Sequence, residues 1–209
     1  MSPAHLPAAL GPVLDSLNLA GTAVFALSGA MLAAEKKQTF VTLAFFAVVT
    51  GVGGGTVRDL LIGAPVFWVH HNATLLICLG ASAFVWLVSA RLWPTRALLW
   101  CDAAGLAAFS AYGAAKGLAF GLAPIPAIGM GVLTGCLGGI IRDVLAGEPS
   151  ILMRPELYVT VAALSSALFV GLYFLGVPPD AAGIIAFLAG FALRGAAIWR
   201  GWSLPAYSR

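Results

Sequence analysis

Two arginine–aspartate pairs, Arg58-Asp59 and Arg142-Asp143, stand inside strongly apolar stretches of the sequence, and each follows a glycine-rich segment. An ionised side chain is costly at membrane depth unless it faces a partner or a water-filled path. The pairs are therefore interpreted as fixed ionic braces between segments, as charges that line or gate an ion path, or as anchors at the membrane interface. A gating arginine would confer voltage dependence, because moving one charge through the membrane field is worth about 2.3 kcal/mol per 100 mV.

The glycine-rich segments predict a break in a membrane-spanning helix. The apolar run 40–50 precedes the first of them, and at about 1.5 Å per residue it covers about half of a bilayer core of about 30 Å. A break at that depth frees backbone N–H and C=O groups, which can line a hydrophilic path. The alternative is a helix that simply ends in a glycine-rich turn. The residues assigned to the breaks and the path are Thr50, Gly51, Gly53, Gly54, Gly55, Thr56, Thr134, Gly135, Gly138 and Gly139.

The two motifs belong to an internal duplication. An offset of 84 residues gives 16 identities over the 46 positions from 20 to 65. A chain this rich in Ala, Leu and Gly would match itself at roughly one position in ten by chance. Interrupted hydrophobic segments at corresponding places in two halves point to a transport site. We expect one membrane domain, residues 1–209, with repeats at 15–96 and 97–176 and an unpaired last helix at 181–199.

The apolar spans predict an all-α membrane protein with seven transmembrane helices. Three spans in each repeat force the second copy to enter the membrane upside down, which predicts two inverted three-helix repeats plus a seventh helix, with the second and fifth helices broken. The predicted spans are 15–34, 40–62, 72–90, 97–120, 125–146, 156–175 and 181–199.

The distribution of Lys and Arg predicts the orientation. Lys116 stands near one side of the membrane, and a larger set stands on or near the other side, so the N-terminus is placed outside and the C-terminus in the cytoplasm. That larger set is Lys36, Lys37, Arg91, Arg96, Arg154, Arg194, Arg200 and Arg209.

Composition excludes several classes of protein. Hydrophobic residues make up 61% of the chain, charged residues 9%, and the mean hydropathy is +0.99, which is too apolar for a soluble domain of this size. No basic run accompanies the net charge of +3, so no nucleic-acid partner is expected. No nucleophile–base set, zinc spacing or phosphate loop stands out, so no enzyme activity, metal or cofactor is expected. The cysteines Cys78, Cys101 and Cys136 lie in apolar spans and are interpreted as packing residues.

Weaker candidates lie outside the two motifs. Asp102, which corresponds to Asn18 across the repeat, is a possible polar residue of the path. Lys116 either contributes to the path or extends to the lipid headgroups. The adjacent His70 and His71 suggest pH sensing or metal binding, but their position after a tryptophan favours an interfacial location.

The doubled motif, Gly-Gly-Gly-Thr-Val-Arg-Asp and Gly-Gly-Ile-Ile-Arg-Asp, resembles the motif pair of the prokaryotic trimeric intracellular cation (TRIC) channels. The resemblance extends over residues 15–199. It implies a homotrimer in a bacterial or archaeal cell membrane, with one path for monovalent cations, mainly potassium, inside each protomer and lipid at the protomer interfaces. It also implies kinks at Gly53, Gly54, Gly55, Gly138 and Gly139, although Leu137 replaces the glycine that corresponds to Gly53.

Three functional hypotheses follow. The first is a potassium-permeable channel whose path runs between the second and fifth helices. The second is a secondary carrier for a small neutral amino acid such as glycine, since related bacterial sequences are described as glycine transporters and inverted repeats with broken helices serve both functions. The third is a structural membrane protein without transport.

Overall fold

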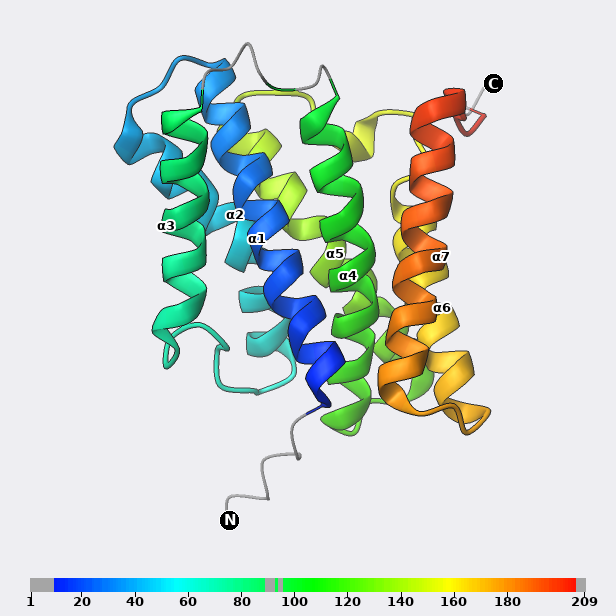
Figure 1. Ribbon diagram of the computed structural model, residues 1–209. Coiled ribbons are helices and arrows are strands. Elements are labelled where there is room, and N and C mark those ends of the chain that lie inside the picture. The colour runs from blue at the N-terminus through cyan, green and yellow to red at the C-terminus, as the bar shows by residue number, and fades with distance from the viewer. Residues whose placement is uncertain (1–9, 89–92, 94–95, 206–209) are drawn as a thin grey trace.

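A computed structural model describes residues 10–88, 93 and 96–205. The predicted end of the third span at residue 90, together with Arg91 and Arg209, lies outside the described residues. The described ranges hold seven α-helices and one short 3-10 helix (Figure 1). They are α1 (Pro12–Glu35), α2 (Phe40–Leu61), α3 (Asn72–Leu87), α4 (Ala97–Ala119), α5 (Pro124–Leu145), η2 (Ile151–Met153), α6 (Val159–Phe174) and α7 (Pro179–Arg200).

The helix boundaries follow from local sequence. Proline occupies the first turn of α1, α5 and α7, where its missing N–H costs nothing. Thr39 precedes α2, and its hydroxyl accepts a hydrogen bond from the Thr42 N–H. Gly63 and Gly147, at equivalent positions after α2 and α5, both have a φ of +68°, which a residue with a side chain rarely adopts. The turn that stops the second helix of each repeat is therefore encoded by glycine.

Seven membrane helices agree with the sequence prediction. Within the described part of the chain, five helices are long and apolar enough to cross a bilayer, and α3 and α6 are shorter apolar helices of 16 residues each. At 1.5 Å per residue, 16 residues extend about 24 Å, which is about 6 Å less than a hydrocarbon core of about 30 Å, and local thinning of the bilayer can accommodate such a difference. The predicted start of the sixth span at Glu156 is corrected to Val159. Residues 151–153 form the separate short helix η2, and residues 154–158, which connect η2 to α6, are not helical.

The two halves run in opposite directions. In Figure 1, α1 rises from the end of the molecule that carries the N-terminus, whereas α4 descends toward that end. The corresponding helices α2 and α5 are likewise opposed, and the two termini lie at opposite ends of the bundle. The prediction of inverted repeats is confirmed, and its cause is the odd number of helices in each copy.

The expected breaks in α2 and α5 are corrected by the structure. Both helices are continuous through their glycines, and neither ends there in a turn. The backbone groups around residues 51–55 and 135–139 thus stay inside the helical hydrogen-bond pattern. A glycine costs about 1 kcal/mol within a helix, and close packing between helices can offset that cost.

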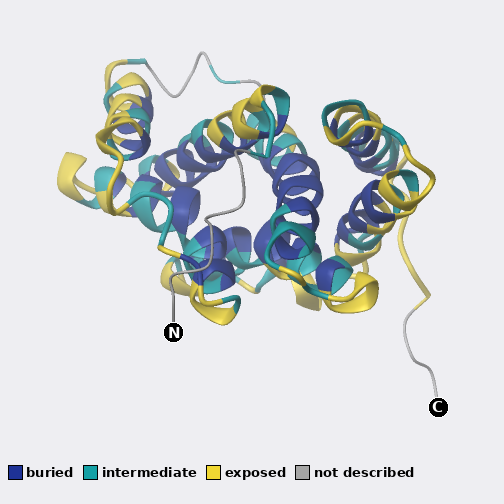
Figure 2. Ribbon diagram, turned by 90° about the horizontal axis from the view of Figure 1, so that it is seen from below, coloured by how far each residue is buried: buried dark blue, intermediate teal, exposed yellow. Residues whose placement is uncertain are grey.

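Aromatic and glycine residues interlock at the centre of the bundle. The rings of Phe25 and Phe109, which are equivalent across the repeat, lie 5.3 Å apart. A Cβ atom added to Gly21 would lie 2.8 Å from the Phe109 ring, and one added to Gly105 would lie 2.9 Å from the Phe25 ring. Figure 2, viewed along the bundle, shows the buried faces of the helices turned toward this centre.

Candidate functional site

A first group of buried charges, here called the outer cluster, lies toward the N-terminal end of the bundle. It consists of Arg58 and Asp59 from α2 and Lys116 from α4. Oδ1 of Asp59 accepts from Arg58 Nε at 2.8 Å and lies 2.8 Å from Lys116 Nζ. Arg58 and Asp59 are fully buried. The guanidinium carbon of Arg58 lies 5.0 Å from the centre of the Tyr112 ring and 5.7 Å from that of Phe67, a cation–π geometry.

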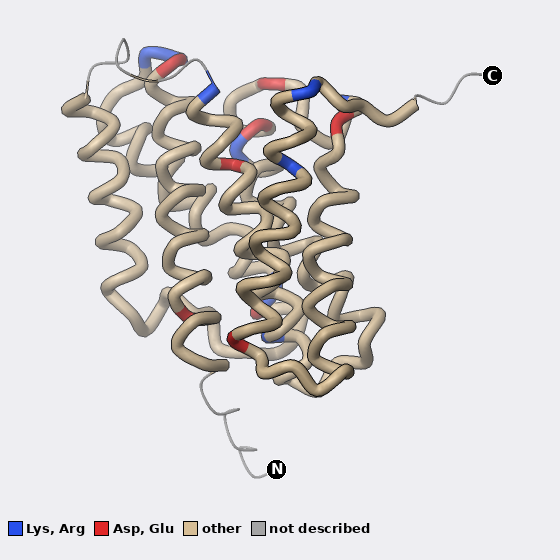
Figure 3. Tube along the Cα trace, turned by 45° about the vertical axis from the view of Figure 1, so that its right-hand side comes forward, with Lys and Arg blue, Asp and Glu red and all other residues tan. Residues whose placement is uncertain are grey.

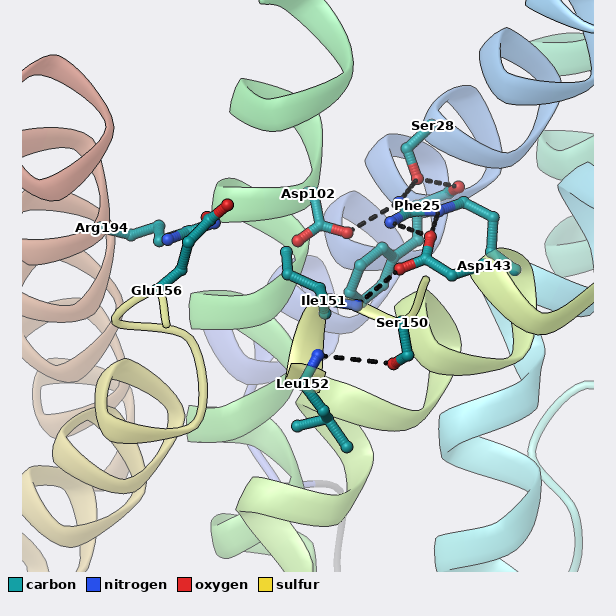
Figure 4. A network of polar contacts seen from close by, with 10 residues as sticks. Phe25, Ser28, Asp102, Asp143, Ser150, Ile151, Leu152, Glu156 and Arg194 are labelled. Atoms are coloured by element: carbon teal, nitrogen blue, oxygen red, sulfur yellow. Dashed lines mark hydrogen bonds and ion pairs between the residues drawn. The ribbon is translucent and has the colours of Figure 1, made fainter. Parts of the chain in front are cut away.

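A second group, the inner cluster, lies toward the C-terminal end. Arg142 and Asp143 come from α5, Asp102 from α4 and Ser28 from α1, and these helices converge in Figure 4. Arg142 Nη1 donates to Asp102 Oδ1 at 2.7 Å and to the Ser28 hydroxyl at 3.0 Å. Its Nε and Nη2 both donate to Asp143 Oδ1, at 2.9 and 2.8 Å. The arginine therefore bridges two buried carboxylates from two helices.

Both clusters use the same backbone anchor. Asp59 Oδ2 accepts from the Phe67 N–H at 2.9 Å, and Asp143 Oδ2 accepts from the Ile151 N–H at 3.0 Å. Each bond spans eight residues, and Phe67 and Ile151 are themselves equivalent positions of the duplication. The aspartates thus fold the chain that follows α2 and α5 back onto the cluster, which is a bracing role. Figure 3 shows charged residues near the two ends of the bundle and an uncharged middle.

The helices α2 and α5 cross between the two clusters. A Cβ atom added to Gly54 would lie 2.3 Å from the carbonyl oxygen of Thr134, and one added to Gly138 would lie 2.6 Å from that of Thr50. Real Cβ contacts are not this short, so only glycine permits this approach of one backbone to the other. The Thr134 hydroxyl donates to the Met130 carbonyl at 2.6 Å. The Thr50 hydroxyl is buried without a hydrogen-bond partner among the described residues.

A cavity reaches each cluster from its own end of the molecule. The outer chamber has a volume of about 490 Å³, and its walls include Asn18, Phe67, Tyr112 and Lys116. The inner chamber has a volume of about 540 Å³ and reaches the inner cluster. The charged residues that line the inner chamber are Glu35, Lys36, Asp102, Arg142, Asp143, Glu148 and Arg154.

An ion pair between Lys36 and Glu148 lies beside the inner chamber and joins the loop that follows α1 to the loop that follows α5. The hydrogen bond from Lys36 and its positive charge lower the pKa of Glu148 below the ordinary value. Glu148 therefore stays ionised, and the pair intact, until the pH falls below the ordinary range for a glutamate.

The structure distributes the predicted site residues over distinct surroundings. Thr50, Gly54, Thr134 and Gly138 meet at the crossing. Thr56 lies elsewhere, since its hydroxyl donates to the Val52 carbonyl and accepts from the Trp68 indole. The remaining glycines have other nearest neighbours: the Thr22 carbonyl for Gly51, the Ile141 side chain for Gly53, the Phe67 ring for Gly55, the Ser110 hydroxyl for Gly135 and the Tyr158 hydroxyl for Gly139.

The weaker candidate residues also lie in different parts of the structure. Asp102 joins Arg142, and Lys116 joins Asp59. His70 and His71 are exposed and line the outer chamber. No group of three or more residues suited to hold a metal occurs among the residues that were placed. The three cysteines are free thiols, and two of them, Cys78 and Cys136, are buried in apolar clusters.

Sequence reasoning missed a third buried cation, Arg194 of α7, which it had placed near the end of its helix. Arg194 is 1% exposed, and its Nη2 lies 2.5 Å from Glu156 Oε2. Its guanidinium carbon lies 5.5 Å from the centre of the Tyr158 ring, whose hydroxyl approaches Gly139. An arginine set within the apolar last span was the available signal, because such a residue requires a partner.

We expect Glu156→Gln to destabilise the protein by about 1–3 kcal/mol, because Arg194 would keep a hydrogen-bond acceptor but lose its counter-charge. The unfolding midpoint of the purified protein measures this effect. Glu35→Gln serves as the control, because Glu35 is exposed. Equal midpoints for the two variants would contradict a structural role for the Arg194–Glu156 pair.

The chain is similar in sequence to a known family and to membrane proteins of other bacteria. The family model described as "Glycine transporter" matches residues 15–90 and 99–173, so that each match contains one glycine–arginine–aspartate motif. A UPF0126 membrane protein of Vibrio cholerae is 37% identical over 201 residues, covering 94% of this chain and 83% of that protein. The UPF0126 inner membrane protein YadS of Escherichia coli is 36% identical over 196 residues, covering 92% of this chain and 95% of that protein.

Solved structures share the whole fold. The TRIC trimeric intracellular cation channel orthologue from Rhodobacter sphaeroides superimposes with a TM-score of 0.85 at 40% identity, covering 92% of this chain and 100% of that chain. A second structure, described in terms of conductance through TRIC cation channels, gives a TM-score of 0.83 at 30% identity and covers 93% of this chain and 97% of that chain.

Proposed function

Because the chain belongs to the prokaryotic TRIC channel family, we propose that it is a cation channel, permeable mainly to potassium, with one path inside each protomer. The observation that carries the proposal is the pair of chambers at opposite ends of the bundle, one lined by Lys116 of the outer cluster and the other by Asp102, Arg142 and Asp143 of the inner cluster. The path runs from one chamber to the other past the crossing of these helices.

The crossing is the narrowest part of the proposed path. The backbones of α2 and α5 approach each other closely there at Gly54 and Gly138, and this close approach supports a proposed path that is closed at that level. Opening requires the two helices to separate or rotate, which would expose the hydroxyl and carbonyl oxygens of Thr50 and Thr134. Oxygen ligands of this kind suit a partly dehydrated monovalent cation.

Charge around the chambers supports cation transport. The inner chamber is lined by four carboxylates against three basic side chains, which gives its walls a net charge of −1. The outer cluster has two cations against one carboxylate, so a permeating cation meets its electrostatic barrier there. Asp59 and Asp143 hold the arginines in place, and Asp102 contributes negative charge to the wall of the inner chamber.

The relatives support a proposed assembly and location. One relative is named an inner membrane protein and one solved neighbour is described as trimeric, which supports a homotrimer in the cell membrane with lipid between its protomers. The N-terminus lies outside and the C-terminus in the cytoplasm, since Lys37, Arg154 and Arg200 belong to the C-terminal end of the bundle and the outer end has few basic residues.

Recording from purified protein in planar bilayers tests the channel hypothesis. Wild-type protein will show unitary potassium currents. Lys116→Met will raise the unitary conductance several-fold, because it removes a positive charge that repels a passing cation from the wall of the outer chamber. Lys37→Met, which removes an exposed lysine that lines neither chamber, will change the conductance less. Unitary currents that are the same in Lys116→Met and wild type would contradict the placement of the path.

The description of the family model supports a second candidate, a carrier for glycine. A carrier moves one substrate per conformational cycle, so it gives saturable uptake into vesicles without unitary currents. Radiolabelled glycine uptake, measured on the same preparation as the bilayer recordings, separates the two functions. Saturable uptake together with silent bilayers would favour the carrier.

A further inference from the structure

The outer cluster lacks a carboxylate that its counterpart has. In the inner cluster, Arg142 binds Asp102 at 2.7 Å. The duplication places Asn18 at the position equivalent to Asp102, and Arg58 at the position equivalent to Arg142. Both terminal nitrogens of Arg58, which are hydrogen-bond donors, are buried without a partner in the described part of the chain. The outer cluster therefore has an arginine equivalent to Arg142 but no carboxylate equivalent to Asp102.

Lys116 increases this imbalance. Its counterpart in the first repeat is the apolar Leu32, so the inner cluster has no equivalent of this lysine. The outer cluster therefore has one cation more and one carboxylate fewer than the inner cluster. The outer cluster contains two cations and one carboxylate, and the inner cluster one cation and two carboxylates. A buried charge without a counter-charge is costly, and the lysine side chain is only 11% exposed.

The groups that surround the outer chamber do not restore the balance locally. Asp15 of α1 lines the chamber but is exposed to solvent, where its charge is screened. His70 and His71, which precede α3, add no negative charge. The chamber has room for a small solute, with Asn18 and Lys116 in its wall and Arg58 behind the rings of Phe67 and Tyr112.

We propose that the outer chamber binds a small monovalent anion, a halide or a carboxylate, against Lys116 Nζ and the side-chain amide of Asn18. The bound anion takes the electrostatic role that Asp102 has in the inner half. Lysine and amide N–H groups are donors that suit such an anion, and Arg58 adds a second positive charge at short range. Within the proposed function, the anion lowers the outer barrier to cations, so potassium conductance rises with anion occupancy at constant potassium.

Thermal unfolding of the purified full-length protein tests binding independently of transport. The starting buffer contains potassium with a bulky sulfonate as its anion, and chloride or acetate replaces the sulfonate at constant potassium. We expect the unfolding midpoint to rise with the logarithm of the anion concentration above Kd, by about 5–10 °C at a hundred-fold excess over Kd. A rise with chloride alone assigns a halide site, and a rise with acetate as well assigns a site that also accepts carboxylates.

Two variants locate the effect. Asn18→Asp supplies the carboxylate within the chain, so its midpoint in sulfonate will be higher than that of wild type and the response to chloride or acetate will vanish. Lys116→Met removes the excess charge and will weaken the apparent affinity at least tenfold. Glu148→Gln, at the opposite end of the bundle, will respond like wild type.

Two results would overturn the proposal: a wild-type midpoint that does not respond to either anion, or variants at both Asn18 and Lys116 that respond like wild type. A response to glycine but to neither anion would also overturn it, because it would show a site for a zwitterion. The failures are distinguishable, since absent potassium currents together with an anion-dependent midpoint shift would contradict the channel and leave the anion site standing.

Discussion

Replacing Gly54 or Gly138 with alanine will destabilise the folded protein by about 1–3 kcal/mol, and leucine at either position will prevent folded protein from accumulating. The reason is the crossing of α2 and α5, where an added Cβ would lie 2.3 Å or 2.6 Å from a backbone carbonyl oxygen. A backbone atom cannot rotate away as a side chain can, so the two helices would have to separate. Size-exclusion profiles and unfolding midpoints of the purified variants measure the effect.

The chain contains matched controls for these substitutions. Gly80 of α3 and Gly129 of α5 are also helical glycines, but a Cβ atom at either would have no neighbour within 4 Å. Alanine there will be neutral or will stabilise the protein by up to about 1 kcal/mol, since it favours the helix. If all four alanine variants lost the same stability, the effect would come from helix propensity or expression, and the tight crossing would play no part.

Arg142→Ala will destabilise the protein by about 3–5 kcal/mol, because it leaves Asp102 and Asp143 buried beside each other without a cation. Arg58→Ala will cost less, since Asp59 keeps Lys116 at 2.8 Å. Unfolding midpoints of the two variants under the same conditions test this order. Equal losses would show that the two clusters do not differ in their charge balance.

A second substitution separates charge from packing in the inner cluster. Arg142→Met keeps much of the side-chain volume and removes the charge, and adding Asp102→Asn then removes one of the two stranded carboxylates. We expect the double variant to recover part of the stability that Arg142→Met loses, as a double-mutant cycle detects. Losses that simply add would indicate that Arg142 stabilises the fold by packing alone.

The correction at the glycines shows where sequence reasoning reached its limit. Four glycines within residues 51–55 predicted a broken helix, since glycine weakens a helix and permits irregular backbone. The structure keeps the helix and uses Gly54 as a contact point for the carbonyl of Thr134, 80 residues away. Whether a glycine bends a helix or admits a neighbour depends on which backbone faces it, and the local sequence does not contain that information.

The sequence by itself determined the membrane class, the number of spans, the duplication and its inversion. Hydropathy is a sum over neighbouring residues, so it needs no knowledge of packing. Because each repeat has an odd number of spans, the second repeat must cross the membrane in the opposite direction to the first. The same reasoning located the two arginine–aspartate pairs, because charge in an apolar span stands out.

Only the tertiary structure decided the partners of those charges. Lys116 meets Asp59, Asp102 meets Arg142, and Arg194 meets Glu156, each across a long stretch of chain. These pairings depend on the rotation of each helix about its axis and on where two helices cross, which are set by ångström-scale packing of side chains contributed by several helices. The unequal charge of the two clusters therefore became visible only when the inverted halves were assembled.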